Sequence, residues 1–137
     1  MSLQLLVNID VDDFERAEAF YVEAFGLRPS RRFGRDGVEL LGAAAPIYLL
    51  RKAAGSAAGD ATAQTRDYRR HWTPVHLDFV VDDLDAALAR AIAAGAHHEG
   101  ARDDSWGRIA TLADPFGHGF CLIQFSGRGY DEIATRA

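Results

Sequence analysis

The feature that most constrains the fold is an internal repeat. Val11-Asp12-Asp13-Phe14 and Val81-Asp82-Asp83-Leu84 match closely and lie 70 residues apart. Each copy follows a run in which apolar residues alternate, 5–11 and 75–81. Such alternation is the period of a half-buried β-strand. We therefore expect the chain to use one supersecondary unit twice.

Each repeat also opens a predicted helix. Asp12 and Asp82 are the expected N-caps, each with an acidic residue three positions later that completes a capping box. Gly26 and Gly95 stand where a left-handed residue would end each helix. The rest of each half predicts three short strands, at 31–33, 38–41 and 47–50 in the first half, and near 97–99, at 108–112 and at 120–125 in the second.

Length and charge exclude several classes of protein. A chain of 137 residues with 48% hydrophobic and 26% charged residues has the composition of one globular domain. Fifteen basic against 20 acidic residues give a net charge of −5, which argues against a nucleic-acid partner. The single cysteine, Cys121, cannot form an intrachain disulfide. No signal peptide or membrane span is found, so we expect a cytoplasmic protein with no membrane partner.

The composition along the chain divides it into four segments. The first strand–helix–strand–strand–strand (βαβββ) module covers 1–52, and an Ala-, Gly- and Ser-rich linker covers 53–72. The second module covers 73–126, and a tail with one expected helical turn covers 127–137. Neither half is long enough for a good core of its own, so the halves form one domain.

Several motifs resemble one known superfamily. They are the run 75–84, the segment Trp106-Gly107-Arg108, the turn Asp114-Pro115-Phe116-Gly117, the strand Cys121-Leu122-Ile123, and an aromatic helix before Phe25-Gly26-Leu27. The chain resembles the vicinal oxygen chelate (VOC) superfamily, which includes glyoxalases, bleomycin-resistance proteins and extradiol dioxygenases. The resemblance implies an α+β fold in which two tandem βαβββ modules form a cupped mixed β-sheet with helices on its outer face. It also implies a homodimer.

The superfamily's enzymes hold a divalent ion with residues from the first and last strand of each half, usually His and Glu. The matching positions in this chain are Leu6, Tyr48, His76 and Cys121. Leucine cannot ligate a metal, neutral tyrosine is a poor ligand, and cysteine favours softer ions. The resemblance therefore implies no conventional metal centre and no cofactor. A divalent ion centred on His76, completed by Asp78 or Glu39, stays open.

Other residues are candidates for ligand contact. Trp106 stands where the drug-binding members use a Trp-Gly pair to wall the pocket, and an indole suits stacking of a planar molecule. The alternatives are that Trp106 fills the core, that His76 hydrogen-bonds Asp78 or a ligand, and that Cys121 is a small buried hydrophobe. The candidate ligand-binding residues are His76, Asp78, Tyr48, Trp106, Cys121, Glu39, Arg108 and Asn8.

Two functions follow from this set. The first is binding of a small aromatic or cationic molecule in the β-cup, in the manner of bleomycin-resistance proteins. The second is a metal-dependent VOC enzyme (a lyase, isomerase or dioxygenase) with a displaced ligand set around His76. Whether the chain is an enzyme stays open, and a glyoxalase-like lyase or a dioxygenase would be the expected kind.

Overall fold

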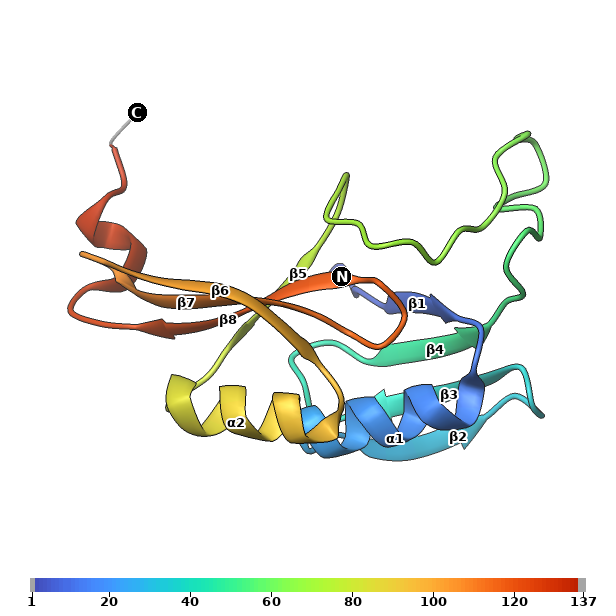
Figure 1. The fold of residues 1–137 in the computed structure, drawn as a ribbon, viewed down its shortest axis with the longest axis horizontal. Helices are drawn as coiled ribbons and strands as arrows, with labels where there is room; N and C mark the ends of the chain where they lie inside the picture. Colours follow the sequence, from blue (N-terminus) through green and yellow to red (C-terminus); the bar gives the residue numbers. More distant parts are fainter. Residues whose placement is uncertain (1, 136–137) are drawn as a thin grey trace. The chain divides into compact units, whose positions relative to one another are not determined.

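The computed structural model describes residues 2–135 of the chain. It divides into two compact units, Met1–Arg69 and Arg70–Ala137, called here unit 1 and unit 2. Each unit holds a four-stranded mixed sheet and one α-helix (Figure 1). The predicted α+β fold with two βαβββ modules is confirmed.

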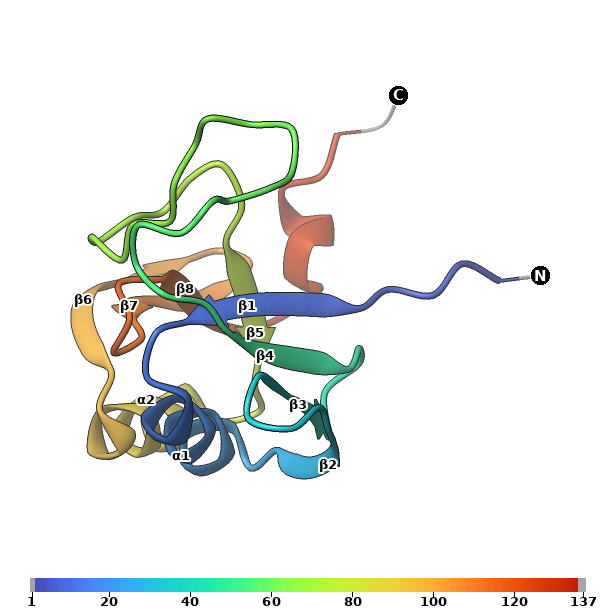
Figure 2. The ribbon, with the colours of Figure 1, turned by 90° about the vertical axis from the view of Figure 1, so that its right-hand side faces the viewer.

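Unit 1 places its first and last strands side by side. The sheet order is β1-β4-β3-β2, with β1 parallel to β4 and the other pairs antiparallel, and Figure 2 shows β1 running along β4. A helix between β1 and β2 makes this parallel pairing possible, because parallel neighbours need a crossover connection. The elements are β1 Val7–Val11, α1 Phe14–Phe25, β2 Arg28–Arg32, β3 Gly37–Leu41 and β4 Ile47–Arg51.

Unit 2 repeats this topology. Its sheet order is β5-β8-β7-β6, again with one parallel pair, β5 with β8. The short 3₁₀ helix η1, Gly129–Glu132, follows as the predicted turn in the tail. The elements are β5 Leu77–Val80, α2 Leu84–Ala94, β6 His97–Asp104, β7 Gly107–Ala113 and β8 Gly119–Phe125.

Both helices begin one residue later than the repeat predicts. The N-caps are Asp13 and Asp83, whose carboxylates accept hydrogen bonds from the backbone N–H of Arg16 and Ala86. The prediction of Asp12 and Asp82 as caps is wrong, because either of two adjacent aspartates satisfies the preference for a short acceptor at this position. Both helices end as predicted, at glycines in the left-handed conformation.

Strand boundaries differ most where the sequence is polar. β6 covers eight residues instead of the predicted three, and β2 begins at Arg28 instead of Arg31. Both are edge strands that are almost wholly exposed, so backbone pairing holds them without an apolar pattern. The first strand of each half is shorter than predicted, because the apolar side chains of Leu5 and Val75 lie exposed outside β1 and β5.

In unit 1 the sheet has one face toward α1 and one face away from it. The Arg32 guanidinium of β2 donates to the Glu18 carboxylate of α1 at 2.7 Å, so the Arg32 side chain points toward the helix. Residues that share its side of the sheet therefore also point toward α1. Val38 and Leu49 share that side and are fully buried. The opposite side is called here the helix-free face of unit 1, and Tyr48 points to it.

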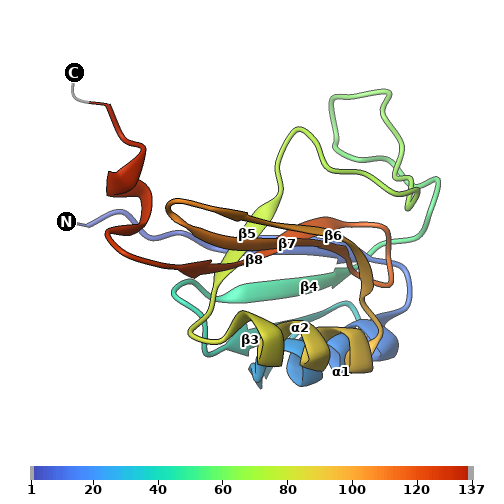
Figure 3. The ribbon, with the colours of Figure 1, turned by 60° about the vertical axis from the view of Figure 1, so that its left-hand side comes forward.

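Unit 2 has the same two faces, and Figure 3 shows α2 along one of them. Gln124 of β8 accepts a hydrogen bond from the backbone N–H of Leu84 at the start of α2, and Arg108 of β7 bonds Asp85 of α2. Because side chains alternate along a strand, the neighbours of Gln124 point the other way. Gly119, Cys121 and Ile123 therefore lie on the helix-free face of unit 2, and Asp78 joins them as the register partner of Cys121.

The predicted linker carries local structure of its own. Ala57 bridges to Thr65 within it, and His71 near its end bridges to His118 just before β8.

Within residues 2–135, no helix combines the length and apolar character that crossing a membrane requires.

Candidate functional site

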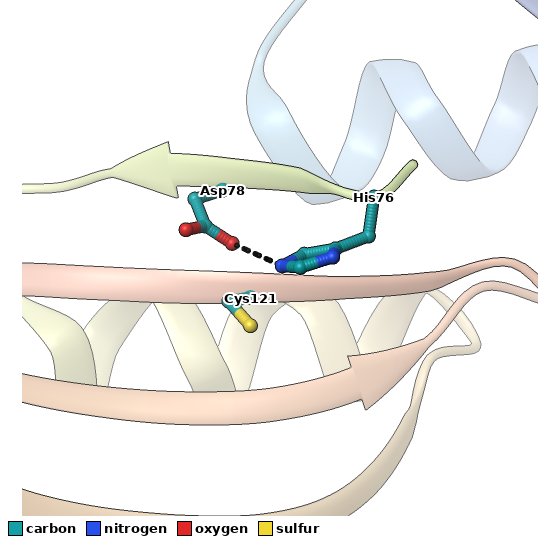
Figure 4. Close-up of side chains that lie close together, drawn as sticks. All are labelled: His76, Asp78 and Cys121. Carbon is teal, nitrogen blue, oxygen red and sulfur yellow. Dashed lines mark ion pairs between the residues drawn. The ribbon is translucent and has the colours of Figure 1, made fainter. Parts of the chain in front are cut away.

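A polar cluster of three side chains lies on the helix-free face of unit 2 (Figure 4). His76 Nε2 lies 3.3 Å from Asp78 Oδ1, and Cys121 is the residue directly opposite Asp78 on the adjacent strand. The nitrogen, oxygen and sulfur atoms of the three all lie within 4.8 Å of one another. The local cause is strand geometry, because His76 and Asp78 are two residues apart and so point the same way.

The Cys121 thiol is protonated at neutral pH. Burial raises its pKa, and its hydrogen bond to the Asp78 carboxylate raises it further, to about 12. A protonated thiol donates to Asp78, so this residue works as a buried hydrogen-bond donor and not as a nucleophile. Cys121 is buried, and the predicted contact between His76 and Asp78 is present. The hydrogen bond from the thiol to Asp78 goes beyond the predicted role of a small buried hydrophobe.

Apolar and aromatic side chains adjoin this cluster. Trp106 and Ile123 pack with Cys121 in one buried group, and Trp72 and Ile109 pack against it. Tyr130 of η1 also contacts Trp106, with ring centroids 5.0 Å apart. The helix-free face of unit 2 thus combines an aromatic surface with a carboxylate, an imidazole and a thiol.

The matching face of unit 1 holds a different constellation. Glu39 of β3 is buried, and both its carboxylate oxygens accept from the Arg31 guanidinium, at 3.1 and 2.7 Å. The Tyr48 hydroxyl donates to the same carboxylate at 2.6 Å. The Arg31 side chain is 68% exposed, so the charge that this group presents to solvent is positive.

These bonds change the acidity of Glu39. The Arg31 guanidinium and the Tyr48 hydroxyl, as hydrogen-bond donors to the charged form, lower the pKa of Glu39 to about 2. With both oxygens engaged, Glu39 has its charge balanced within unit 1. Asn8 lies on the same face as the exposed register partner of Tyr48.

The predicted site residues therefore fall into three places. His76, Asp78, Cys121 and Trp106 lie together on unit 2, and Asn8, Glu39 and Tyr48 lie together on unit 1. Arg108 belongs to neither group. It points to the α2 side of its sheet and bonds Asp85 at 2.9 Å and Asp103 at 3.3 Å.

Two residues of these faces were not singled out from the sequence. Arg31 stands in a polar edge strand, and only the irregular pairing of β2 with β3 brings it to Glu39. Trp72 stands at the end of the predicted linker, where no strand pattern marks it. An isolated tryptophan in an otherwise polar linker was the one signal that could have drawn attention to it.

The positions that hold the metal in VOC enzymes carry different kinds of residue in the two units. Leu6 lies before β1 and offers no donor atom, and the Tyr48 phenol is bonded to Glu39 and Arg31. Unit 1 therefore does not fit the superfamily's ion. In unit 2 the imidazole, carboxylate and thiol fit an ion that accepts nitrogen, oxygen and sulfur ligands, such as Zn²⁺. The thiol would have to lose its proton first.

Known proteins are similar to this chain in sequence. An anthracycline biosynthesis protein, DauV from Streptomyces sp. (strain C5), is 31% identical over 119 residues. The match covers 86% of this chain but only 40% of that longer protein. An uncharacterized protein from Mycobacterium bovis is 36% identical over 124 residues, which cover 85% of this chain and 80% of that protein.

The similarity to solved structures is also extensive. The structure of TnmS3, described as an antibiotic binding protein from Streptomyces sp. CB03234, has a TM-score of 0.66 at 26% identity. The match covers 92% of this chain and 98% of TnmS3. The sequence model of the glyoxalase-like domain matches residues 6–123, which span both modules. The chain therefore belongs to the glyoxalase-like domain family of the VOC superfamily.

Proposed function

We propose that this chain binds a small planar molecule, aromatic or cationic, without a conventional metal centre. The observation that carries the proposal is the helix-free face of unit 2, where Trp106 and Ile123 pack with Cys121, the residue opposite Asp78 on the adjacent strand. Binding sites for small molecules combine apolar and aromatic walls with a few polar groups that orient the ligand.

The Asp78 carboxylate on this face favours a cation. Asp78 is bonded to the uncharged Cys121 thiol and lies beside His76, and among residues 2–135 no arginine or lysine pairs with it. Its negative charge is therefore available to a ligand. The net charge of −5 for the whole chain has the same sign and would raise the local concentration of cations.

The descriptions of two relatives support the binding of a small molecule. TnmS3 is described as an antibiotic binding protein, and DauV is described as an anthracycline biosynthesis protein. For the present chain, binding of such a molecule is our proposal.

A thermal-shift screen tests the proposal. Planar aromatic cations are added at a hundredfold excess over a micromolar Kd, where mass action adds about 2.7 kcal/mol to stability. We expect a clear rise in Tm with at least one of them, and a smaller rise in Asp78→Asn. If no planar or cationic compound raises the Tm of the unaltered chain, the proposal fails.

The cluster of His76, Asp78 and Cys121 favours a second function, a metal-dependent VOC enzyme with a displaced ligand set. Its test is metal content by elemental analysis after purification with Zn²⁺, Ni²⁺, Mn²⁺ and Fe²⁺ offered in turn. Stoichiometric metal in the unaltered chain that is absent from His76→Ala would favour this enzyme over the metal-free binder. Less than about a tenth of an ion per chain in both the unaltered chain and His76→Ala would contradict the metal-dependent enzyme and favour the metal-free binder.

A further inference from the structure

Two histidines of unit 2 face one another across a bridge between distant segments. His71 Nε2 lies 2.7 Å from His118 Nδ1, and the two imidazole planes meet at 77° with their centroids 4.9 Å apart. The residues are 47 positions apart in the sequence, so only the folded chain brings them together. They are not the residues of the cluster formed by His76, Asp78 and Cys121.

Backbone hydrogen bonds hold both histidines in position. The His71 N–H donates to the Gly117 carbonyl, and the His71 carbonyl accepts from the Gly119 N–H, each at 2.9 Å. The buried carboxylate of Asp114 accepts from the backbone N–H of His118, also at 2.9 Å. Because both main chains are fixed, the two imidazoles need little ordering to bind one ion together.

The distance between the two ring nitrogens decides which ion fits. Imidazole nitrogens lie about 2.0–2.1 Å from a late first-row divalent ion, so two of them are about 2.9 Å apart at right angles and about 3.3 Å apart in a tetrahedron. The observed 2.7 Å has to open by only about 0.2 Å for two positions at right angles. Tetragonal sites with nitrogen ligands are typical of Cu²⁺ and Ni²⁺.

An ion can bind between the two rings without a net loss of protons. A neutral imidazole carries a hydrogen on one nitrogen and a lone pair on the other. In the metal-free pair, the facing nitrogen of one ring donates its hydrogen to the facing nitrogen of the other ring. On metal binding, that ring loses its hydrogen from the facing nitrogen and gains one on its outward nitrogen, so both facing lone pairs bind the ion.

The surroundings of the pair admit a cation. His71 is exposed and His118 is half-buried, so solvent reaches the facing nitrogens. The neighbouring Arg70 guanidinium donates two hydrogen bonds to the Glu99 carboxylate, which offsets its positive charge. The Asp114 carboxylate, bonded to the His118 backbone, adds negative charge to the same turn.

We propose that His71 and His118 form a chelate site for Cu²⁺ or Ni²⁺, with water in the remaining positions. A bound ion joins the end of the linker to the turn before β8 and so stabilises folded unit 2, because the unfolded chain does not present the pair. This inference is independent of the proposed binding function and of the His76 cluster.

The experiment is a calorimetric titration of the tag-free chain with Ni²⁺. It is done at pH 7.5, above the pKa near 6.5 of an ordinary imidazole, in two buffers that differ in their enthalpy of ionisation. We expect one Ni²⁺ per chain and the same binding enthalpy in both buffers, since no net proton is released. An ion held by Cys121 would release the thiol proton and give a buffer-dependent enthalpy.

Variants then locate the ion. His71→Gln and His118→Gln are each expected to weaken Ni²⁺ binding at least about tenfold, because the second imidazole of a fixed pair binds intramolecularly. His76→Ala should bind Ni²⁺ as the unaltered chain does. His98→Gln is the matched control, because His98 is an exposed histidine bonded to the Gly100 carbonyl and not to a second imidazole.

A thermal-shift measurement gives a second readout on the same chains. Ni²⁺ should raise the Tm of the unaltered chain and of His98→Gln, and should leave the Tm of His71→Gln and His118→Gln nearly unchanged. Should one glutamine variant fail to fold, the other decides the test.

Three results would overturn the site. They are full Ni²⁺ affinity in a folded His71→Gln or His118→Gln chain, loss of the ion from His76→Ala, and no binding by the unaltered chain at millimolar Ni²⁺. None of the three bears on the binding of a planar cation, which the screen described above tests separately.

Discussion

Tyr48 and Cys121 occupy matching positions in the two units, and each is bonded to a carboxylate on its own helix-free face. In unit 1 the carboxylate of Glu39 is also bound by the Arg31 guanidinium, so its charge is balanced internally. In unit 2 the partners of Asp78 are a neutral thiol and an imidazole. In unit 1 the matching position thus lies beside a carboxylate that a guanidinium binds. In unit 2 it lies beside a carboxylate whose partners are a thiol and an imidazole.

The ion pair of unit 1 predicts a loss of stability in acid. Because the pKa of Glu39 is lowered to about 2, its contribution is fully present above about pH 4.5 and is lost as the pH falls toward 2. In Glu39→Gln that contribution is absent at every pH. Denaturant unfolding should therefore show a stability difference between the two chains that is largest at neutral pH and shrinks toward pH 2.

Asp36→Asn is the control for this measurement, because the Asp36 side chain is 77% exposed and its contact with Arg51 is long, at 3.4 Å. Surface pairs of this kind contribute little to stability. A pH-independent difference between the unaltered chain and Glu39→Gln would contradict the ion pair as the cause.

The raised pKa of Cys121 predicts slow alkylation of its thiol. With a pKa raised to about 12, the thiol should react with iodoacetamide at pH 8 at least about a hundredfold more slowly than a cysteine in an unfolded peptide. Burial contributes to that rate, so Asp78→Asn provides the sharper comparison. It removes the carboxylate that raises the pKa, and alkylation followed by mass spectrometry should be faster. An unchanged rate in a folded Asp78→Asn chain would show that Asp78 does not hold the thiol proton.

At the scale of elements, the sequence predicted what the apolar pattern and the repeat encode. Both helices, their glycine stops and the apolar strands β3, β4, β7 and β8 lie within one or two residues of their predicted bounds. The polar edge strands β2 and β6 were predicted too short, because cross-strand backbone bonds alone define them.

The site was predictable only in part, for a related reason. His76, Asp78 and Cys121 follow from strand alternation and a parallel pairing, so their proximity could be expected. The Arg31–Glu39 bond depends on an irregular register between β2 and β3, and Trp72 depends on a bridge between segments 47 residues apart. Local sequence patterns do not encode contacts of either kind.

The helix caps give a prediction at this scale. Asp13→Ala and Asp83→Ala each remove the acceptor for a first-turn N–H and should lower the free energy of unfolding by about 1 kcal/mol. The neighbouring substitutions Asp12→Ala and Asp82→Ala are the matched controls, with little expected loss. Chemical denaturation measures all four. An equal loss from Asp12→Ala and Asp13→Ala would mean that the two aspartates share the capping.

At the scale of the whole molecule, the two units are copies of one module that differ in the chemistry of their helix-free faces. We expect the chain to form a homodimer, as its superfamily commonly does. Light scattering at micromolar concentration should then give twice the 15.0 kDa of the single chain. A mass of one chain under those conditions would contradict this prediction.

Ligand binding by the helix-free face of unit 2 is tested most directly by amide chemical shifts of the ¹⁵N-labelled chain during titration with 9-aminoacridine, a planar aromatic cation. The largest shifts should fall on Cys121–Ile123, on Trp106 with its indole N–H, and on Asp78. The unit 1 sheet and the α2 side of the unit 2 sheet should change little. Shifts that centre on α2 or on the Arg31–Glu39 pair, or that spread evenly over the chain, would contradict the site.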